Sequence, residues 1–221
     1  MRFDIITIFP EIFSSYFQES LLARAQEKNL IEINVHDLRE WTSDAHKTVD
    51  DKPFGGGLGM VMKIEPIYKA VTALKSEIRS ASWRTKSETI LFTPRGKKFT
   101  QSKAYEYAKM KQIILICGRY EGVDERVGKH IADEQISIGD YDVMGGELPA
   151  MIVVETVSRL IPGVIGKDEF LKEHIQSGGF VEYPQYTRPE VFRDWKVPKI
   201  LLSGDHKKIE GWRATHGRVI K

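Results

Sequence analysis

The sequence predicts an α/β protein built on a parallel sheet. Apolar runs of strand length alternate along the chain with segments of helical period, and glycine-rich turns follow several of the apolar runs. The chain has 221 residues, of which 41% are hydrophobic and 29% charged, and it contains no internal repeat or low-complexity segment. This composition is typical of a globular protein with a substantial core.

The first elements follow from the spacing of apolar residues. Residues 2–9 read as a buried strand, which Pro10 ends. Apolar positions then recur at helical spacing as far as Lys28, and residues 31–35 alternate as in a second strand. The long polar loop at 42–59 follows, and loops of this length are usually functional or disordered.

The downstream elements alternate in the same way. The predicted strands are 89–92, 113–116 and 134–138, and the predicted helices are 65–78, 101–109, 123–130 and 147–160. Residues 163–188 have no strong period and are expected to link two domains. A last helix is expected to begin at Asp205, a suitable N-cap, and to end near Gly217.

Three glycine-rich segments carry charged side chains where predicted strands end: Cys117–Arg126, Ser137–Tyr141 and Gly145–Pro149. In open α/β sheets this edge binds ligands, and glycine lets the backbone approach a ligand closely. The segments could therefore wrap a small cofactor, although three ordinary strand-to-helix turns would explain the glycines equally well. The charged residues of the first segment, Arg119, Glu121, Asp124, Glu125 and Arg126, could equally pair with one another.

Several common catalytic motifs are absent from the sequence. It has no Gly-x-Gly-x-x-Gly after a strand, no Walker A loop and no Gly-x-Ser-x-Gly elbow, and its six histidines and single cysteine lack zinc spacing. These absences disfavour hydride transfer, NTP hydrolysis, serine hydrolysis and structural zinc. They leave a transferase that uses another nucleotide-like cofactor.

Charge is distributed unevenly along the chain. The formal net charge is +2, but residues 193–221 hold eight Lys and Arg against three acids, a net of +5. This end could meet a phosphate backbone, or it could be an ordinary solvated helix face. The lone Cys117 is expected to be a buried, inert thiol. No signal peptide and no apolar stretch of about 20 residues is found, which predicts a cytoplasmic protein without a membrane partner.

Longer strings are more specific than these spacings. Besides the glycine-rich segments they are Phe3–Pro10 (FDIITIFP), Thr48–Gly57 (TVDDKPFGGG) and Pro184–Glu190 (PQYTRPE). Through them nearly the whole chain strongly resembles the bacterial tRNA (guanine-N1)-methyltransferases of the TrmD type, in the knotted SPOUT class. The resemblance implies a homodimer, with its active site at the interface, that moves a methyl group from S-adenosylmethionine to N1 of the guanosine at tRNA position 37, just 3′ of the anticodon.

The resemblance also implies an architecture. The parallel sheet would contain a deep trefoil knot, which physical reasoning alone would not predict because threaded chains are rare. Residues 1–162 are expected to form the S-adenosylmethionine-binding domain and residues 163–188 the interdomain linker. Residues 189–221 are expected to form a small, mainly helical domain that binds the anticodon arm of tRNA.

The resemblance further implies binding residues. The expected cofactor-binding residues are Pro94, Gly118, Tyr120, Glu121, Gly122, Ile138, Gly139, Asp140, Tyr141, Asp142, Val143, Gly145, Leu148 and Pro149. The expected RNA-binding residues are His46, Lys47, Asp50 and Arg188. A requirement for Mg²⁺ is implied as well, although no spacing in the sequence shows a metal site.

Methylation at N1 requires a base and a group that stabilises charge on the guanine. The resemblance places Arg159 at O6, where negative charge develops as N1 loses its proton; otherwise Arg159 is a cation favoured at a helix C-terminus. The family's base is a linker aspartate, and here His174 stands at that position. Either His174 or the neighbouring Glu173 is expected to accept the proton, unless the proton leaves by another route or His174 is merely exposed to solvent.

Two alternative functions remain open. A related SPOUT enzyme could act on another RNA or on ribose, although the string Pro184–Glu190 argues against it. A non-catalytic protein that has lost its base at position 174 would bind tRNA with a steep salt dependence and transfer no methyl group.

Overall fold

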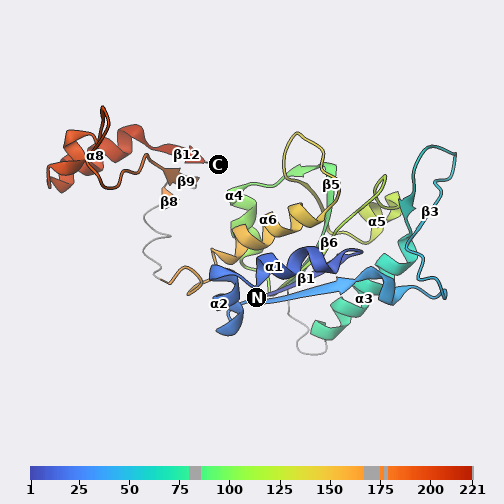
Figure 1. Cartoon of the computed structure of the whole chain (residues 1–221). Helices are drawn as coiled ribbons and strands as arrows, with labels where there is room; N and C mark the ends of the chain where they lie inside the picture. Colours follow the sequence, from blue (N-terminus) through green and yellow to red (C-terminus); the bar gives the residue numbers. More distant parts are fainter. Residues whose placement is uncertain (80–85, 167–174, 177–178, 221) are drawn as a thin grey trace. The chain divides into compact units, whose positions relative to one another are not determined.

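The computed structural model describes residues 1–79, 86–166, 175–176 and 179–220. The chain divides into two compact units, Met1–Asp168 and Glu169–Lys221, which are coloured from blue to orange and from orange to red in Figure 1.

The N-terminal unit is built on a five-stranded parallel sheet. Its strands are β1 (Arg2–Thr7), β2 (Glu32–Asp37), β5 (Ser87–Lys98), β6 (Gln112–Ile116) and β7 (Glu134–Ser137). They lie in the order β2-β1-β6-β5-β7, and each neighbouring pair is parallel. The predicted α/β class with a parallel sheet is therefore confirmed.

Helices connect these strands. They are the 3-10 helices η1 (Pro10–Phe13) and η2 (Leu38–Trp41), and the α-helices α1 (Ser14–Phe17), α2 (Ser20–Glu27), α3 (Ile64–Arg79), α4 (Gln101–Tyr107), α5 (Glu125–His130) and α6 (Glu147–Ser158). The helix expected to run to Lys28 is instead divided into η1, α1 and α2, and the chain bends at the start of α2, where Ser20 has a positive φ of 53°. A small antiparallel hairpin, β3 (Asp50–Asp51) with β4 (Val61–Met62), lies within the long polar region after η2.

The two faces of the sheet pack into two separate cores. Because side chains alternate along β1, Phe3 and Ile5 lie on one face of the sheet, where they pack with the buried residues of α4 and α6. Ile6 lies on the other face and packs with the buried residues of α3 and α5. All five residues of β6 are buried. A strand covered by helices on both faces is mostly apolar, which explains the apolar runs in the sequence.

A buried carboxylate lies among the apolar residues of β1. Asp4 has no exposed surface, and its Oδ2 accepts hydrogen bonds from Arg2 and from Gln112 Nε2, both at 2.8 Å. The Nε2 atom of His36 lies 2.9 Å from Oδ1. Burial acts to raise the pKa of Asp4, but the hydrogen bonds from His36, Arg2 and Gln112 outweigh it and hold the pKa below its ordinary value.

The C-terminal unit combines short strands with helix. Its elements are β8 (Ile175–Gln176), β9 (Gly179–Glu182), β10 (Val191–Phe192), β11 (Trp195–Lys196), η3 (Lys199–Leu202), α8 (His206–His216) and β12 (Arg218–Ile220). The predicted last helix is confirmed as α8, and Asp205 caps it by accepting from the Lys208 amide at 3.2 Å.

Within 189–220, the stretch expected to be mainly helical, the helices η3 and α8 are accompanied by the short strands β10, β11 and β12. β12, β9 and β8 form an antiparallel sheet, and β10 pairs with β11 as a hairpin. β9 also lies within the stretch 163–188 that was expected to be a linker. These strands have two to four residues each, too few for an alternating pattern to be visible in the sequence.

Candidate functional site

The sheet is irregular between β5 and β7. β5 pairs with β7 up to Phe92 and again from Lys97, so the intervening residues 93–96 arch away from the sheet. Gly96 brings the arch back against its partner strand. A Cβ atom there would lie 2.6 Å from the backbone nitrogen and carbonyl carbon of Ile136, closer than real Cβ atoms approach. The arch therefore depends on glycine at this position.

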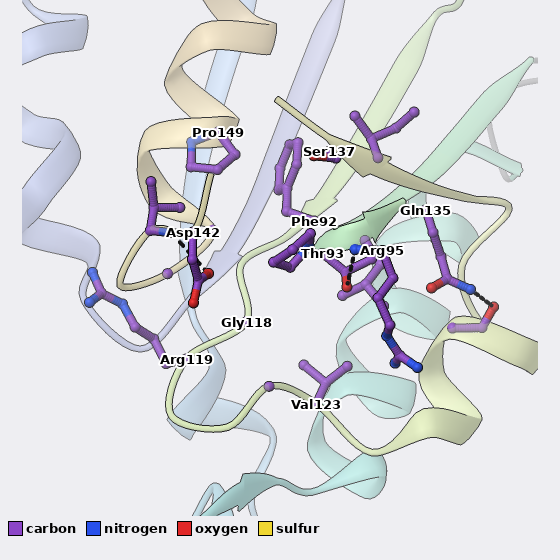
Figure 2. A pocket seen from close by; sticks show the side chains of 18 of the residues that line it. Phe92, Thr93, Arg95, Gly118, Arg119, Val123, Gln135, Ser137, Asp142 and Pro149 are labelled. Carbon is purple, nitrogen blue, oxygen red and sulfur yellow. Dashed lines mark hydrogen bonds between the residues drawn. The ribbon is translucent and has the colours of Figure 1, made fainter. Parts of the chain in front are cut away.

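The arch forms one wall of a cavity of about 810 Å³ at the carboxyl ends of β5, β6 and β7. The other walls are the loop 118–125 after β6 and the segment between β7 and the first turn of α6, and Figure 2 shows side chains from all three converging on it. The volume suits a small-molecule site, and the edge is the one where parallel sheets bind ligands.

Most of the predicted cofactor residues meet in this cavity. Twelve of the fourteen line it: Pro94, Gly118, Tyr120, Glu121, Gly122, Ile138, Tyr141, Asp142, Val143, Gly145, Leu148 and Pro149. The described lining residues do not include Gly139 and Asp140. The Gly139 carbonyl accepts a hydrogen bond from Ser137 Oγ at 2.8 Å, and Asp140 pairs with Lys98.

The cavity also has lining residues that the sequence did not single out as site residues. They are Leu91, Phe92, Thr93, Arg95, Arg119, Val123, Asp124, Glu125, Gly128, Gln135, Ile136, Ser137, Met144 and Gly146. Phe92 and Ile136 are buried strand residues, which no local pattern distinguishes from ordinary core. They reach the cavity because the register of β5 against β7 shifts beside them.

A buried ion pair fixes two of the cavity walls. Glu147, in the first turn of α6, is 1% exposed, and its Oε2 accepts a hydrogen bond from Arg119 Nε at 2.8 Å. Thr7 Oγ1, at the end of β1, donates to Oε1 at 2.8 Å. Arg119 also donates to the Met144 carbonyl at 3.3 Å, and its guanidinium lies 4.9 Å from the centre of the Phe9 ring. This network ties the ends of β1 and β6 to the start of α6.

The pairing within the loop 118–125 is therefore only partly local. Arg126 does pair with Asp124, at 2.7 Å, but Arg119 pairs with Glu147, which is 28 residues away. Arg95 and Glu125, which both line the cavity, form an ion pair at 2.7 Å. The lining holds four carboxylates and two guanidinium groups, so its formal charge is negative.

The backbone behind the cavity is tightly packed. A Cβ atom on Gly146 would lie 2.5 Å from the Cα atom of Cys117. Cys117 is buried, as the sequence predicts, and burial raises the pKa of its thiol well above the ordinary value. The thiol therefore stays protonated and serves as a packing group.

The expected catalytic residues do not lie in this cavity within the described part of the chain. Arg159 follows the last turn of α6, twelve residues from Glu147, so about 18 Å of helix separates it from the cavity end. His174 and Glu173 lie outside the described residues.

The expected RNA-binding residues lie on the surface in both units. His46 and Lys47 are exposed in the loop before β3, and Asp50 is half-buried in β3 itself. Arg188 is exposed in the C-terminal unit. The described residues that line the cavity include none of these four.

Within the described ranges, no group of three or more His, Cys, Asp or Glu side chains could hold a metal ion. Among the helices that the structure describes, none has the length and apolar character needed to cross a membrane.

Comparison with known proteins identifies the family. The family model described as tRNA (Guanine-1)-methyltransferase TrmD matches residues 1–219. Over 213 residues the chain is 54% identical to a tRNA (guanine-N(1)-)-methyltransferase of Dictyoglomus turgidum and 50% identical to that of Geobacter sp. strain M21, covering 96% of this chain and 83% of each relative.

A solved structure agrees with these matches. The crystal structure of tRNA (m1G37) methyltransferase from Aquifex aeolicus superposes with a TM-score of 0.78 at 41% identity, covering 98% of this chain and 88% of that one. Fold, sequence and cavity agree, and the chain belongs to the tRNA (guanine-1)-methyltransferase family.

Proposed function

We propose that this protein transfers a methyl group from S-adenosylmethionine to N1 of the guanosine at position 37 of tRNA, 3′ of the anticodon. The observation that carries the proposal is the cavity of about 810 Å³, which gathers twelve of the expected cofactor residues in a chain matching the family over residues 1–219. A cytoplasmic location fits this substrate.

The residues around the cavity fit S-adenosylmethionine. Phe92, Ile136, Leu148 and Pro149 offer apolar surface for a flat base, and the glycines of the loop after β6 leave backbone groups accessible. The excess of carboxylates in the lining favours a positively charged ligand. When bound, the cofactor would supply an electrophilic methyl group.

We infer that the cavity lies within a trefoil knot. Two close backbone approaches support this: Gly96 against Ile136 where the arch returns, and Gly146 against Cys117 where α6 begins. A threaded chain brings backbone segments this close, and glycine is the residue that permits it.

Proton removal and charge stabilisation fall to residues outside the cavity walls. Arg159 would stabilise the negative charge that develops on guanine O6. His174, or Glu173 beside it, would accept the N1 proton, because N1 becomes nucleophilic only as that proton leaves. With about 18 Å of helix between them, Arg159 and the cavity of the same chain are too far apart to act together.

A homodimer would resolve this separation, with Arg159 of the partner subunit completing the site. The surface supports such a dimer: Phe9, just before η1, and Ile12, Tyr16 and Ile152, on η1, α1 and α6, are each 40–43% exposed. These elements are joined by the Tyr16 hydroxyl, which lies 3.1 Å from Glu155 of α6. Clustered apolar surface of this kind is typical of protein interfaces.

The tRNA would be held by both units. Residues 1–162 would form the cofactor domain, 163–188 the linker and 189–221 the unit that meets the anticodon arm, with β9 of the linker region pairing onto β12. His46, Lys47, Asp50 and Arg188 are proposed RNA contacts. The basic excess after residue 193 supports contact with phosphates.

Methyl transfer tests the function directly. Labelled S-adenosylmethionine is incubated with an unmodified tRNA transcript carrying guanosine at position 37, or with a control transcript carrying adenosine there, and the product nucleoside is identified. We expect 1-methylguanosine from the first transcript only. Product on neither transcript would refute the assignment, and salt-dependent tRNA binding without any product would favour the non-catalytic alternative.

Variants then test the roles. Arg159→Ala and His174→Ala are expected to lower the rate of the chemical step while cofactor affinity is kept. Arg24→Ala, an exposed arginine in the last turn of α2, is the matched control for Arg159. If His174→Ala is fully active, the base is sought next at Glu173.

A further inference from the structure

The β3–β4 hairpin is hydrogen-bonded to the loop that forms one cavity wall. The Met60 carbonyl accepts from the Glu121 amide, the Met62 amide donates to the Gly122 carbonyl, and the Met62 carbonyl accepts from the Asp124 amide, each at 3.0 Å. A parallel bridge joins Met62 to Val123. The strand that leaves the hairpin therefore runs along the cavity loop, and the two segments form one backbone unit.

Within this unit, Gly59 lies directly against Glu121. A Cβ atom on Gly59 would lie 2.8 Å from Glu121 Cγ and 2.9 Å from its Oε1. Real Cβ atoms essentially never approach that closely, so a side chain at position 59 and the present position of Glu121 exclude each other. Gly59 also has a positive φ of 83°, which itself favours glycine.

The neighbouring glycines do not share this contact. Gly55 and Gly56 have positive φ values of 86° and 81°, yet among the described atoms nothing lies within 4 Å of a Cβ built on either. Their conformations explain why they are glycine. At position 59 there is a second and separate reason for glycine, because a side chain there would clash with Glu121 of the cavity wall.

We propose that Gly59 is a positioning residue for the cofactor cavity, because its missing side chain leaves the space in which Glu121 lies on the cavity wall. In the part of the chain that the structure describes, Glu121 is exposed and no ion pair or side-chain hydrogen bond holds its carboxylate, so the space beside Gly59 limits where the side chain can lie. The inference rests on the proposed function, since it takes the cavity to be the S-adenosylmethionine site. The β3–β4 hairpin, which carries the proposed RNA contact Asp50, would then also be part of the cofactor site.

A matched pair of alanine variants tests the proposal. Gly59→Ala and Gly56→Ala place alanine at nearly the same φ, so both carry the same backbone strain, but only the first displaces Glu121. The affinity of the full chain for S-adenosylmethionine is measured by calorimetry without RNA. We expect Gly59→Ala to weaken binding about tenfold and Gly56→Ala less than about twofold, the difference expected when one charged contact to a cationic ligand is lost.

A double-mutant cycle separates this effect from general damage. If Gly59 acts through Glu121, then in the Glu121→Ala background the Gly59→Ala change has no further effect on affinity. A crystal structure of Gly59→Ala without cofactor gives an independent readout, with Glu121 expected in a different rotamer.

Three results would overturn the proposal. They are equal affinities for Gly59→Ala and Gly56→Ala, an undiminished effect of Gly59→Ala when Glu121 is absent, and an unchanged Glu121 rotamer. If these occur while the wild type binds the cofactor and methylates tRNA, only the positioning role fails. If the wild type does not bind S-adenosylmethionine at all, the proposed function fails with it.

Discussion

Replacing Glu147 by alanine should destabilise the N-terminal unit strongly. The change removes the acceptor of Arg119 Nε and of Thr7 Oγ1, each at 2.8 Å, from a position that is 1% exposed. Breaking a buried ion pair by deleting one partner costs about 3–5 kcal/mol. The Arg119 side chain is 20% exposed and can turn partly to water, so we expect the lower end, about 3 kcal/mol.

This loss should be visible in thermal unfolding of the cofactor-free protein. For a unit of this size, each kcal/mol lowers the Tm by about 2–4 °C, so Glu147→Ala should unfold about 6–12 °C below the wild type. Glu147→Gln keeps an oxygen that can accept from Arg119 and should lose less. Glu27→Ala, an exposed glutamate at the end of α2, is the control and should change the free energy of unfolding by no more than about 0.5 kcal/mol.

The Tm values of the two Glu147 variants decide whether the ion pair with Arg119 stabilises this unit. If Glu147→Ala unfolds within about 2 °C of the control, the ion pair does not hold the cavity walls together, and our account of the network is wrong. If Glu147→Gln loses as much as Glu147→Ala, the negative charge is what matters, since the amide has almost the same shape.

Three further predictions concern pH and glycine. Burial acts to raise the pKa of Asp4, but hydrogen bonds, led by that from His36, outweigh it, so folding lowers this pKa. The ionised carboxylate therefore stabilises the fold above the ordinary pKa of 3.8, and this stabilisation is lost as pH falls through the folded pKa. In urea unfolding, the stability advantage of the wild type over Asp4→Asn should shrink below about pH 4, and a constant difference would contradict this. Gly96→Ala would place Cβ 2.6 Å from the Ile136 backbone and should reduce soluble yield and lower Tm by several degrees, and a wild-type melting curve would disprove the close approach. Gly211 lies in α8, and among the described atoms the space around it is open. Gly211→Ala should therefore stabilise that helix by about 0.5–1 kcal/mol. The gain should be seen as slower amide exchange in α8, and unchanged exchange would count against it.

Much of the fold could be predicted from local sequence, but the pairing of strands could not. The strands in the sheet coincide with apolar runs, because both faces are covered by helices. Nothing in the run 2–9 indicates that its neighbour is β6, which begins at Gln112. β5 is longer than predicted, because the polar residues after the arch pair with β7 a second time.

The candidate site could likewise be predicted only in part from the sequence. Its glycine-rich segments are contiguous strings, so the sequence could identify most of their cavity residues. Phe92 was missed because its role depends on a register shift, and the Arg119–Glu147 pair was missed because charged neighbours closer in sequence were equally good partners. The close contact of Gly59 with Glu121 likewise joins residues on different segments, which spacing alone does not reveal.

The place of β1 in the sheet has a consequence for synthesis on the ribosome. β1 is made before the other four strands of its sheet but lies between β2 and β6, so one of its edges stays unpaired until residue 116 has emerged. An apolar strand with an open edge is prone to associate with other chains. Nascent chains that end before β6 should therefore aggregate, whereas chains that extend past α6 should not.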